Sequence, residues 1–104
     1  MISRHWRGVT RVTEADNYVG HLEHHIFPQF ARMTGFVSAS VLRRRVAAGV
    51  EFCVVTTWQS MESIRQFAGD SPDVAVVPAV VQAMMVEFEK TVAHYEVVET
   101  FTPG

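Results

Sequence analysis

The sequence has little that would stabilise a fold covalently or carry it across a membrane. Its 104 residues include one cysteine, Cys53, which excludes an internal disulfide and predicts a reducing compartment. No apolar run approaches the roughly 20 residues that span a bilayer. The first eight residues also lack the apolar core of a signal peptide. These absences predict a soluble protein located in the cytoplasm.

An excess of positive charge is also missing. The chain has 9 Lys and Arg against 11 Asp and Glu, a formal net charge of -2, which excludes a general basic surface for nucleic acid or an anionic membrane. A glycine-rich phosphate loop, a paired-cysteine zinc pattern and a nucleophile elbow are absent too, which disfavours a nucleotide-dependent enzyme. No repeat, low-complexity tract or linker divides the chain. Residues 1–104 are therefore predicted to form one domain.

Hydrophobic periodicity predicts alternating strands and helices. Strands are expected at residues 2–12, 36–45, 51–58 and 91–101, and helices after residue 13, at 61–67 and at 79–85. Ser60 is the expected cap of the second helix, and Pro78 the expected first residue of the third. Pro28 has no amide hydrogen, so it is expected to break or kink the first helix near residues 25–27. Gly49 is expected to supply the hairpin turn between the second and third strands.

The resulting order is β-α-β-β-α-β, which is that of the ferredoxin-like α+β fold. It predicts a four-stranded antiparallel sheet with helices on one face. Hydrophobic residues make up 48% of the chain, and a domain of this size buries only about two-thirds of the surface that its unfolded chain exposes. The face without helices therefore needs a partner. A second copy placed sheet to sheet is the simplest one, which predicts a homodimer.

Several short stretches of the chain resemble one known family. They are Trp6-Arg7-Gly8, Gly35-Phe36, Glu51-Phe52, Thr57-Trp58-Gln59-Ser60, Phe67-Ala68-Gly69 and His94-Tyr95-Glu96-Val97. Together they resemble the antibiotic biosynthesis monooxygenase family of dimeric α+β barrels, over almost the whole chain. The resemblance implies a dimer with a pocket between sheet and helices in each subunit. Some members of the family oxygenate polycyclic aromatic substrates without metal or flavin and others degrade haem, so the resemblance does not fix the reaction.

The haem-degrading branch of that family can be compared residue by residue. Its first-strand Asn is replaced here by Arg4 or His5, and its second-helix Trp by Phe67. No His lies between Trp58 and His94 to act as the axial ligand. Haem degradation by that mechanism is therefore not expected, and neither a cofactor nor a bound metal is predicted.

The candidate catalytic residues are His94 and Tyr18. His94 alternates with apolar residues of the last strand and titrates near neutral pH, which makes it the candidate general base, unless it is a half-buried histidine paired with a polar neighbour. Tyr18 lies on the apolar stripe of the first helix, where its hydroxyl would orient a substrate oxygen or else bond a backbone carbonyl. Candidate walls for a flat substrate, or ordinary core residues, are Trp6, Trp58 and Phe67.

Two other polar groups are expected to have structural roles. His21, His24 and His25 have helical spacing but lie off the apolar stripe, which predicts a solvated face rather than a metal site. Arg43-Arg44-Arg45 is expected at a solvated hairpin end, although it could attract an anionic partner.

Two functions from different classes follow from these residues. The first is a small cofactor-independent monooxygenase acting on an apolar aromatic or quinol-like molecule. The second is a dimeric barrel that binds a small molecule, or is associated with stress, without catalysis. The pocket distinguishes the two: a cavity open to His94 and Tyr18 favours the enzyme, whereas a cavity filled with side chains favours binding or no activity.

Overall fold

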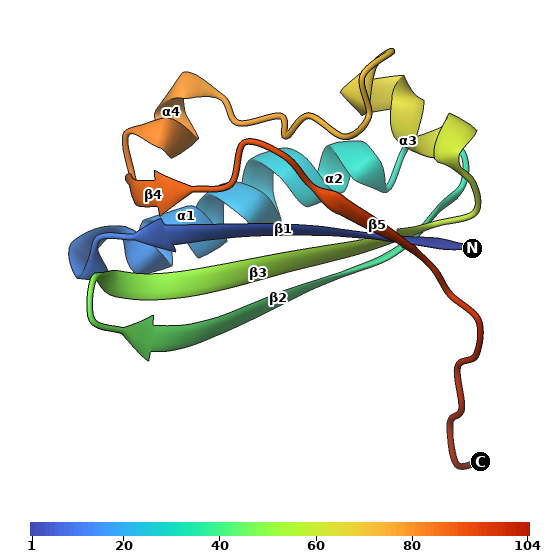
Figure 1. Ribbon diagram of the computed structural model, residues 1–104, viewed down its shortest axis with the longest axis horizontal. Helices are drawn as coiled ribbons and strands as arrows, with labels where there is room; N and C mark the ends of the chain where they lie inside the picture. The colour runs from blue at the N-terminus through green and yellow to red at the C-terminus, as the bar shows by residue number, and fades with distance from the viewer.

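The computed structural model describes residues 1–104 and has two layers. An antiparallel sheet forms one layer, and helices cover one of its faces (Figure 1). The strands are β1 (Ile2–Thr10), β2 (Phe36–Val46), β3 (Gly49–Trp58), β4 (Met85–Phe88) and β5 (Ala93–Glu96), and the helices are α1 (Ala15–His21), α2 (Phe27–Phe30), α3 (Met61–Ala68) and α4 (Ala79–Gln82). The sheet order is β2-β3-β1-β4, with β5 also on β1, which confirms the ferredoxin-like α+β fold.

The last strand differs from the prediction. In place of one strand over residues 91–101, β4 and β5 form two short strands on the same edge of β1, so the sheet has five strands. Between them, Glu89 N–H still donates to the Arg7 carbonyl of β1 at 2.9 Å, but the residues from Lys90 to Val92 pair with a loop instead. Ala75 N–H donates to the Lys90 carbonyl at 2.9 Å, and Val92 N–H donates to the Asp73 carbonyl at 2.9 Å. This pairing draws the chain away from β1 and brings the loop next to the sheet edge.

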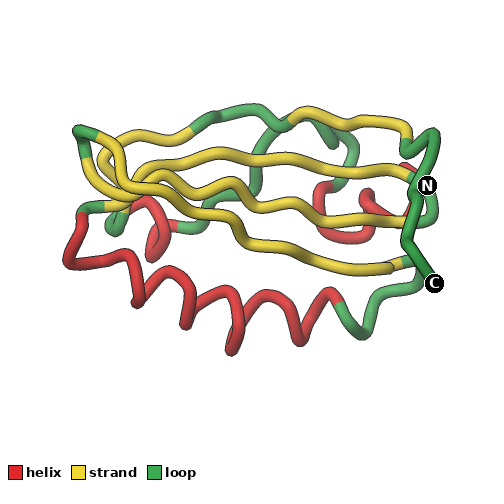
Figure 2. Tube along the Cα trace, turned by 90° about the horizontal axis from the view of Figure 1, so that it is seen from below, coloured by secondary structure: helices red, strands yellow, loops and turns green.

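The sequence predicted a break or a kink of the first helix near residues 25–27, and the structure has an irregular turn there without a break. Residues Leu22–Ile26 form a π-helical turn, in which the N–H of Phe27 donates to the carbonyl of Leu22, five residues earlier. The wider turn makes room for the proline ring, which in an ordinary α-helix collides with the carbonyl four residues before it. As a result, α1 and α2 form one continuous helical run along the sheet (Figure 2).

Two local predictions are confirmed. Ser60 accepts a hydrogen bond from the N–H of Ser63 and caps α3. Gly49 lies at the β2–β3 turn with a φ of 154°, a conformation that side chains disfavour. A Cβ atom at Gly49 would lie 2.0 Å from the carbonyl oxygen of Thr10, so the turn needs glycine for space as well as for conformation.

The two faces of the sheet have different surroundings. One face packs against the helices: Trp6 pairs with Val54 across β1 and β3, and both pack against the core cluster that contains Tyr18. The opposite face, which we call the open face, carries the cross-strand row Arg7, Cys53 and Leu42. No helix covers it, so its apolar side chains are exposed to solvent unless another chain covers them.

The C-terminal residues leave the body of the protein. After β5 the chain runs past the sheet and away from the helices (Figure 1), and the side chains of Val98 and Phe101 are 88% and 83% exposed. The accessible surface is 6587 Å², against about 5,900 Å² for an average monomer of this mass. The extended C-terminal residues and the uncovered face of the sheet both contribute to this larger surface.

None of the helices combines the length and the hydrophobicity that a transmembrane span requires.

Candidate functional site

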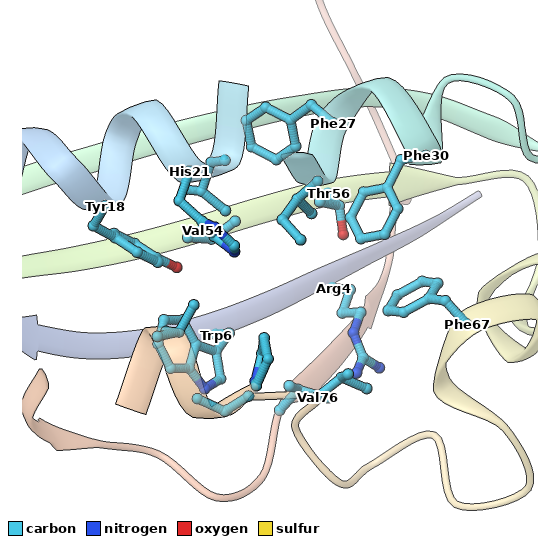
Figure 3. Close-up of a pocket in the computed structure, with 16 residues that line it drawn as sticks. Arg4, Trp6, Tyr18, His21, Phe27, Phe30, Val54, Thr56, Phe67 and Val76 are labelled. Carbon is cyan, nitrogen blue, oxygen red and sulfur yellow. The ribbon is translucent and has the colours of Figure 1, made fainter. Parts of the chain in front are cut away.

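A pocket of about 100 Å³ lies between the sheet and the α1–α2 run. Its lining is mostly apolar, with aromatic walls, and the four polar side chains that reach it are Arg4, Tyr18, His21 and Thr56 (Figure 3). Val76 also lines the pocket although it is largely exposed, so the pocket reaches the surface beside it. An apolar site with a few polar groups is the usual form of a small-molecule site.

Tyr18 lies on α1 and is almost completely buried. Its ring packs edge-on against Phe52, with ring centres 5.0 Å apart, and lies 6.2 Å from the ring of Trp6. No protein group bonds its hydroxyl, which is directed into the pocket (Figure 3). Burial raises the pKa of Tyr18, so the phenol stays protonated and can donate a hydrogen bond to a ligand.

His21 follows Tyr18 by three residues and lines the same pocket. The prediction of a solvated face is therefore wrong for His21, although His24 and His25 are exposed. Its Nε2 is buried and has no hydrogen-bond partner. Burial, and then the neighbouring His25 with its ring centre 5.6 Å away, hold the pKa of His21 below the ordinary 6.5. The ring is therefore largely neutral at pH 7, and no group of the protein occupies its Nε2.

The predicted aromatic walls divide into two groups. Trp6 and Phe67 line the pocket. Trp58 does not, because it is fully buried behind the lining, where its ring centre lies 5.2 Å from that of Phe67 and 5.3 Å from that of Phe30. Trp58 thus supports two wall residues from behind, in the core position that the sequence left open as the alternative.

His94, the predicted base, does not line the pocket. Its Nε2 lies 2.8 Å from Nη1 of Arg4, and its Nδ1 lies 3.2 Å from Oδ1 of Asp73. Because a guanidinium only donates, Nε2 must accept, and the neutral ring therefore carries its proton on Nδ1 and donates to Asp73. Burial, and then Arg4, lower the pKa of His94, while Asp73 opposes the shift. Both nitrogens are engaged, which corresponds to the alternative of a half-buried histidine paired with polar neighbours.

Sequence reasoning gave no pocket role to Arg4, His21 or Thr56, although a signal existed for each. Strand alternation places Arg4 on the same face as Trp6, and Thr56 on the same face as Trp58. His21 lies one helical turn from Tyr18, on a neighbouring part of the helix surface. In each case the polar side chain suggested solvent, whereas the spacing indicated the interior.

The remaining polar clusters lie away from the pocket. Arg43 pairs with Asp16 at 3.0 Å and Arg44 with Glu51 at 2.9 Å, both near the hairpin end. These pairs agree with the solvated surface expected for the basic run. No group of three or more His, Cys, Asp or Glu side chains is arranged to hold a metal ion.

The chain matches no protein-family model and no curated protein, but its fold matches several solved structures. A protein from Bacillus cereus, assigned as an antibiotic biosynthesis monooxygenase, superposes with a TM-score of 0.67 and 16% identity over 99% of this chain and 96% of that one. A mutant of SnoaB from Streptomyces nogalater, a cofactor-independent oxygenase, superposes with a TM-score of 0.66 and 17% identity, over 98% of this chain and 97% of that one. The heme-degrader MhuD from Mycobacterium tuberculosis superposes with a TM-score of 0.67 and 16% identity, over 98% of this chain and 100% of that one. The resemblance noted in the sequence is thus confirmed as a shared fold, and at these identities the reaction has to be argued from the site.

Proposed function

We propose that this protein is a small monooxygenase that uses no cofactor and acts on an aromatic molecule with an activated, acidic C–H group. One observation carries the proposal: His21, whose Nε2 has no hydrogen-bond partner, and Tyr18, whose hydroxyl is unbonded, line the same aromatic pocket. The first is suited to accept a proton and the second to stabilise the charge that results. The shared fold with SnoaB, described as a cofactor-independent oxygenase, supports the reaction class.

The proposed reaction begins with proton transfer. Nε2 of His21 removes a proton from an activated methylene group, and Tyr18 donates a hydrogen bond to the substrate oxygen on which the negative charge develops. The carbanion reduces dioxygen and a C–O bond forms, which gives a peroxide anion that protonated His21 converts to a hydroperoxide. Loss of the second C–H proton and cleavage of the O–O bond release water and leave a carbonyl. One methylene and one dioxygen thus yield one carbonyl and one water, and the substrate carbon supplies all the electrons.

The apolar walls support this chemistry by excluding water. Trp6 and Phe67 offer flat surfaces to an aromatic ring, and the aliphatic remainder of the lining leaves few competing hydrogen-bond partners. A carbanion in such a site is protected from protonation by solvent. Because the pocket opens beside the exposed Val76, a molecule larger than the cavity can project there.

Anthrone is a suitable probe because its methylene lies between two aromatic rings. The purified protein is expected to convert it to anthraquinone faster than buffer alone, with one dioxygen consumed per molecule. Oxygen-18-labelled dioxygen should place one labelled atom in the new carbonyl, and a metal chelator should not change the rate. A matched control is Arg45→Met, which alters an exposed strand residue far from the pocket. Conversion no faster than buffer, or a label that enters from water, would contradict the proposal.

A second candidate is a protein that binds a small molecule without catalysis. It is favoured by the absence of any hydrogen bond that fixes the ring of His21, whereas both nitrogens of His94 have partners. A base without an orienting group is less well prepared for proton transfer. Anthrone binding without turnover would support this candidate. Haem is not proposed as the substrate, because Phe67 stands where the haem-degrading branch has its Trp and no His lies between Trp58 and His94 to act as the axial ligand.

The open face is proposed to form a homodimer with a second copy. Leu42 on β2 and Tyr95 on β5 are both more than half exposed on it, and the ion pair of Arg7 with Glu51 neutralises charge in its centre. Sedimentation should give twice the chain mass of 11.7 kDa. Leu42→Arg should shift the protein towards a monomer, whereas Val80→Arg on the helical side should not. A monomer at micromolar concentration would contradict the assignment.

A further inference from the structure

Arg4 is a buried cation without a carboxylate partner. Its side chain rises from β1 into the pocket and is only 6% exposed, and no Asp or Glu lies within ion-pair distance of it. Burial lowers the pKa of Arg4 to about 10, which still leaves the guanidinium charged at pH 7. A buried charge of this kind is costly unless a partner compensates it.

The protein holds the guanidinium in place along one side. Nη1 donates to the Pro72 carbonyl at 2.5 Å and to Nε2 of His94 at 2.8 Å, and Nη2 donates to the Val74 carbonyl at 3.4 Å. The ring of Phe67 lies under it, 5.1 Å from the central carbon. All these direct partners are neutral, so they orient the charge without neutralising it; Asp73, behind His94, acts on the charge from a distance and only partly opposes the effect of burial on the pKa of Arg4.

One edge of the guanidinium is left without a partner. A guanidinium has five N–H groups, and the contacts with the loop and with His94 use both groups of Nη1 and one of Nη2. The Nε–H and one N–H of Nη2 remain, and these two nitrogens form the edge of a guanidinium that matches the two oxygens of a carboxylate. Two free donors on a buried cation are the arrangement expected of an anion-binding site.

The position of Arg4 also separates it from the proton-transfer groups. Figure 3 shows Arg4 beside Phe67 at one end of the pocket, with Tyr18 at the other end and His21 between Tyr18 and the phenylalanine walls. A ligand that fills the apolar middle would therefore present one polar group to each end. A single neutral hydrocarbon would leave Arg4 uncompensated.

We propose that Arg4 binds a carboxylate carried by the aromatic substrate, so that the substrate class is an aromatic carboxylic acid whose reacting carbon lies next to His21. The identity of the reacting carbon rests on the proposed oxygenase function, whereas the carboxylate subsite does not. In this arrangement Arg4 is a binding residue, and His94, backed by Asp73, is a positioning residue that keeps the guanidinium directed along the pocket. A bound carboxylate would also compensate the unfavourable free energy of burying the charge of Arg4.

The test compares two molecules of nearly equal shape, 2-naphthoate and 2-naphthamide, by calorimetric titration without any turnover. The wild-type protein is expected to bind the carboxylate at least about tenfold more tightly than the amide, as expected for charge-assisted hydrogen bonds in an apolar site. Arg4→Met should weaken naphthoate binding by at least about tenfold and leave naphthamide binding within about threefold. Arg45→Met, which removes the same charge from an exposed site, should change neither.

The wild-type comparison decides the matter even if Arg4→Met unfolds, because Arg4 also joins the loop at Pro72 and Val74 to the sheet. Equal affinity of the wild type for naphthoate and naphthamide would overturn the proposal, and so would an equal loss of both in a folded Arg4→Met protein. His94→Gln should weaken naphthoate binding while the charge of Arg4 remains. Failure of anthrone oxidation would leave these binding results unchanged, so the subsite and the oxygenase function fail separately.

Discussion

His21→Gln is expected to lower the turnover of an activated methylene substrate by about 10²–10⁴-fold, the usual contribution of a general base. Glutamine has a similar size and polarity but does not take up a proton near neutral pH. The measurement is the anthrone oxidation rate at saturating anthrone, with circular dichroism to verify the fold. Undiminished turnover by a folded His21→Gln protein would remove the base from the proposed mechanism, whatever the substrate.

The pH profile gives the same assignment a second, independent readout. Only neutral His21 accepts a proton, and burial and His25 hold its pKa below 6.5. The wild-type rate should therefore decline at acidic pH, with the midpoint of the decline below 6.5. His25→Gln, which alters an exposed residue outside the pocket lining, removes one cause of the shift, so the acidic limb should move to higher pH. An acidic limb that does not move would show that another group controls the rate.

Gly49→Ala is expected to reduce the free energy of unfolding by more than about 2 kcal/mol. Two costs combine at this residue: a φ of 154°, and a Cβ placed 2.0 Å from the Thr10 carbonyl oxygen, which belongs to the backbone and cannot rotate away. Urea denaturation measures the loss. It should appear as a lower midpoint with an unchanged slope.

Gly20→Ala is the matched control for that substitution. Gly20 lies within α1, and a Cβ there meets no atom within 4 Å. Alanine should therefore leave stability unchanged or raise it by up to about 1 kcal/mol, since alanine favours the helix more than glycine does. Equal midpoints for the two variants would mean that the β2–β3 turn tolerates a side chain.

The fold could be predicted because its signals are local. The alternation in β3, the cap at Ser60 and the turn at Gly49 each depend on a few neighbouring residues, and the structure confirms them. The last strand could not be predicted in the same way. Its interruption depends on hydrogen bonds between Lys90 or Val92 and the loop at Asp73, which no window of sequence contains.

The site was harder to predict than the fold because its central contacts join distant parts of the chain. Arg4 meets His94 through the register of β1 with β5, and their numbers differ by 90. Taken alone in the sequence, His94 was a candidate base. Its role as a hydrogen-bond acceptor for Arg4 became visible only once the register of β1 with β5 was known. Tyr18, Trp6 and Phe67 were recognisable beforehand because aromatic residues on an apolar face need no distant partner to be placed.

The widened turn at Leu22–Ile26 lets one extra residue fit into the helical run without rotating its second half. A turn closed by an N–H that reaches five residues back takes one residue more than an α-helical turn to complete the circle, so α2 keeps nearly the phase that an unbroken α-helix would give it. Tyr18 and His21 before the turn, and Phe27 and Phe30 after it, therefore line one pocket. Removing one residue would tighten the turn and return the collision between the proline ring and the carbonyl four residues before it.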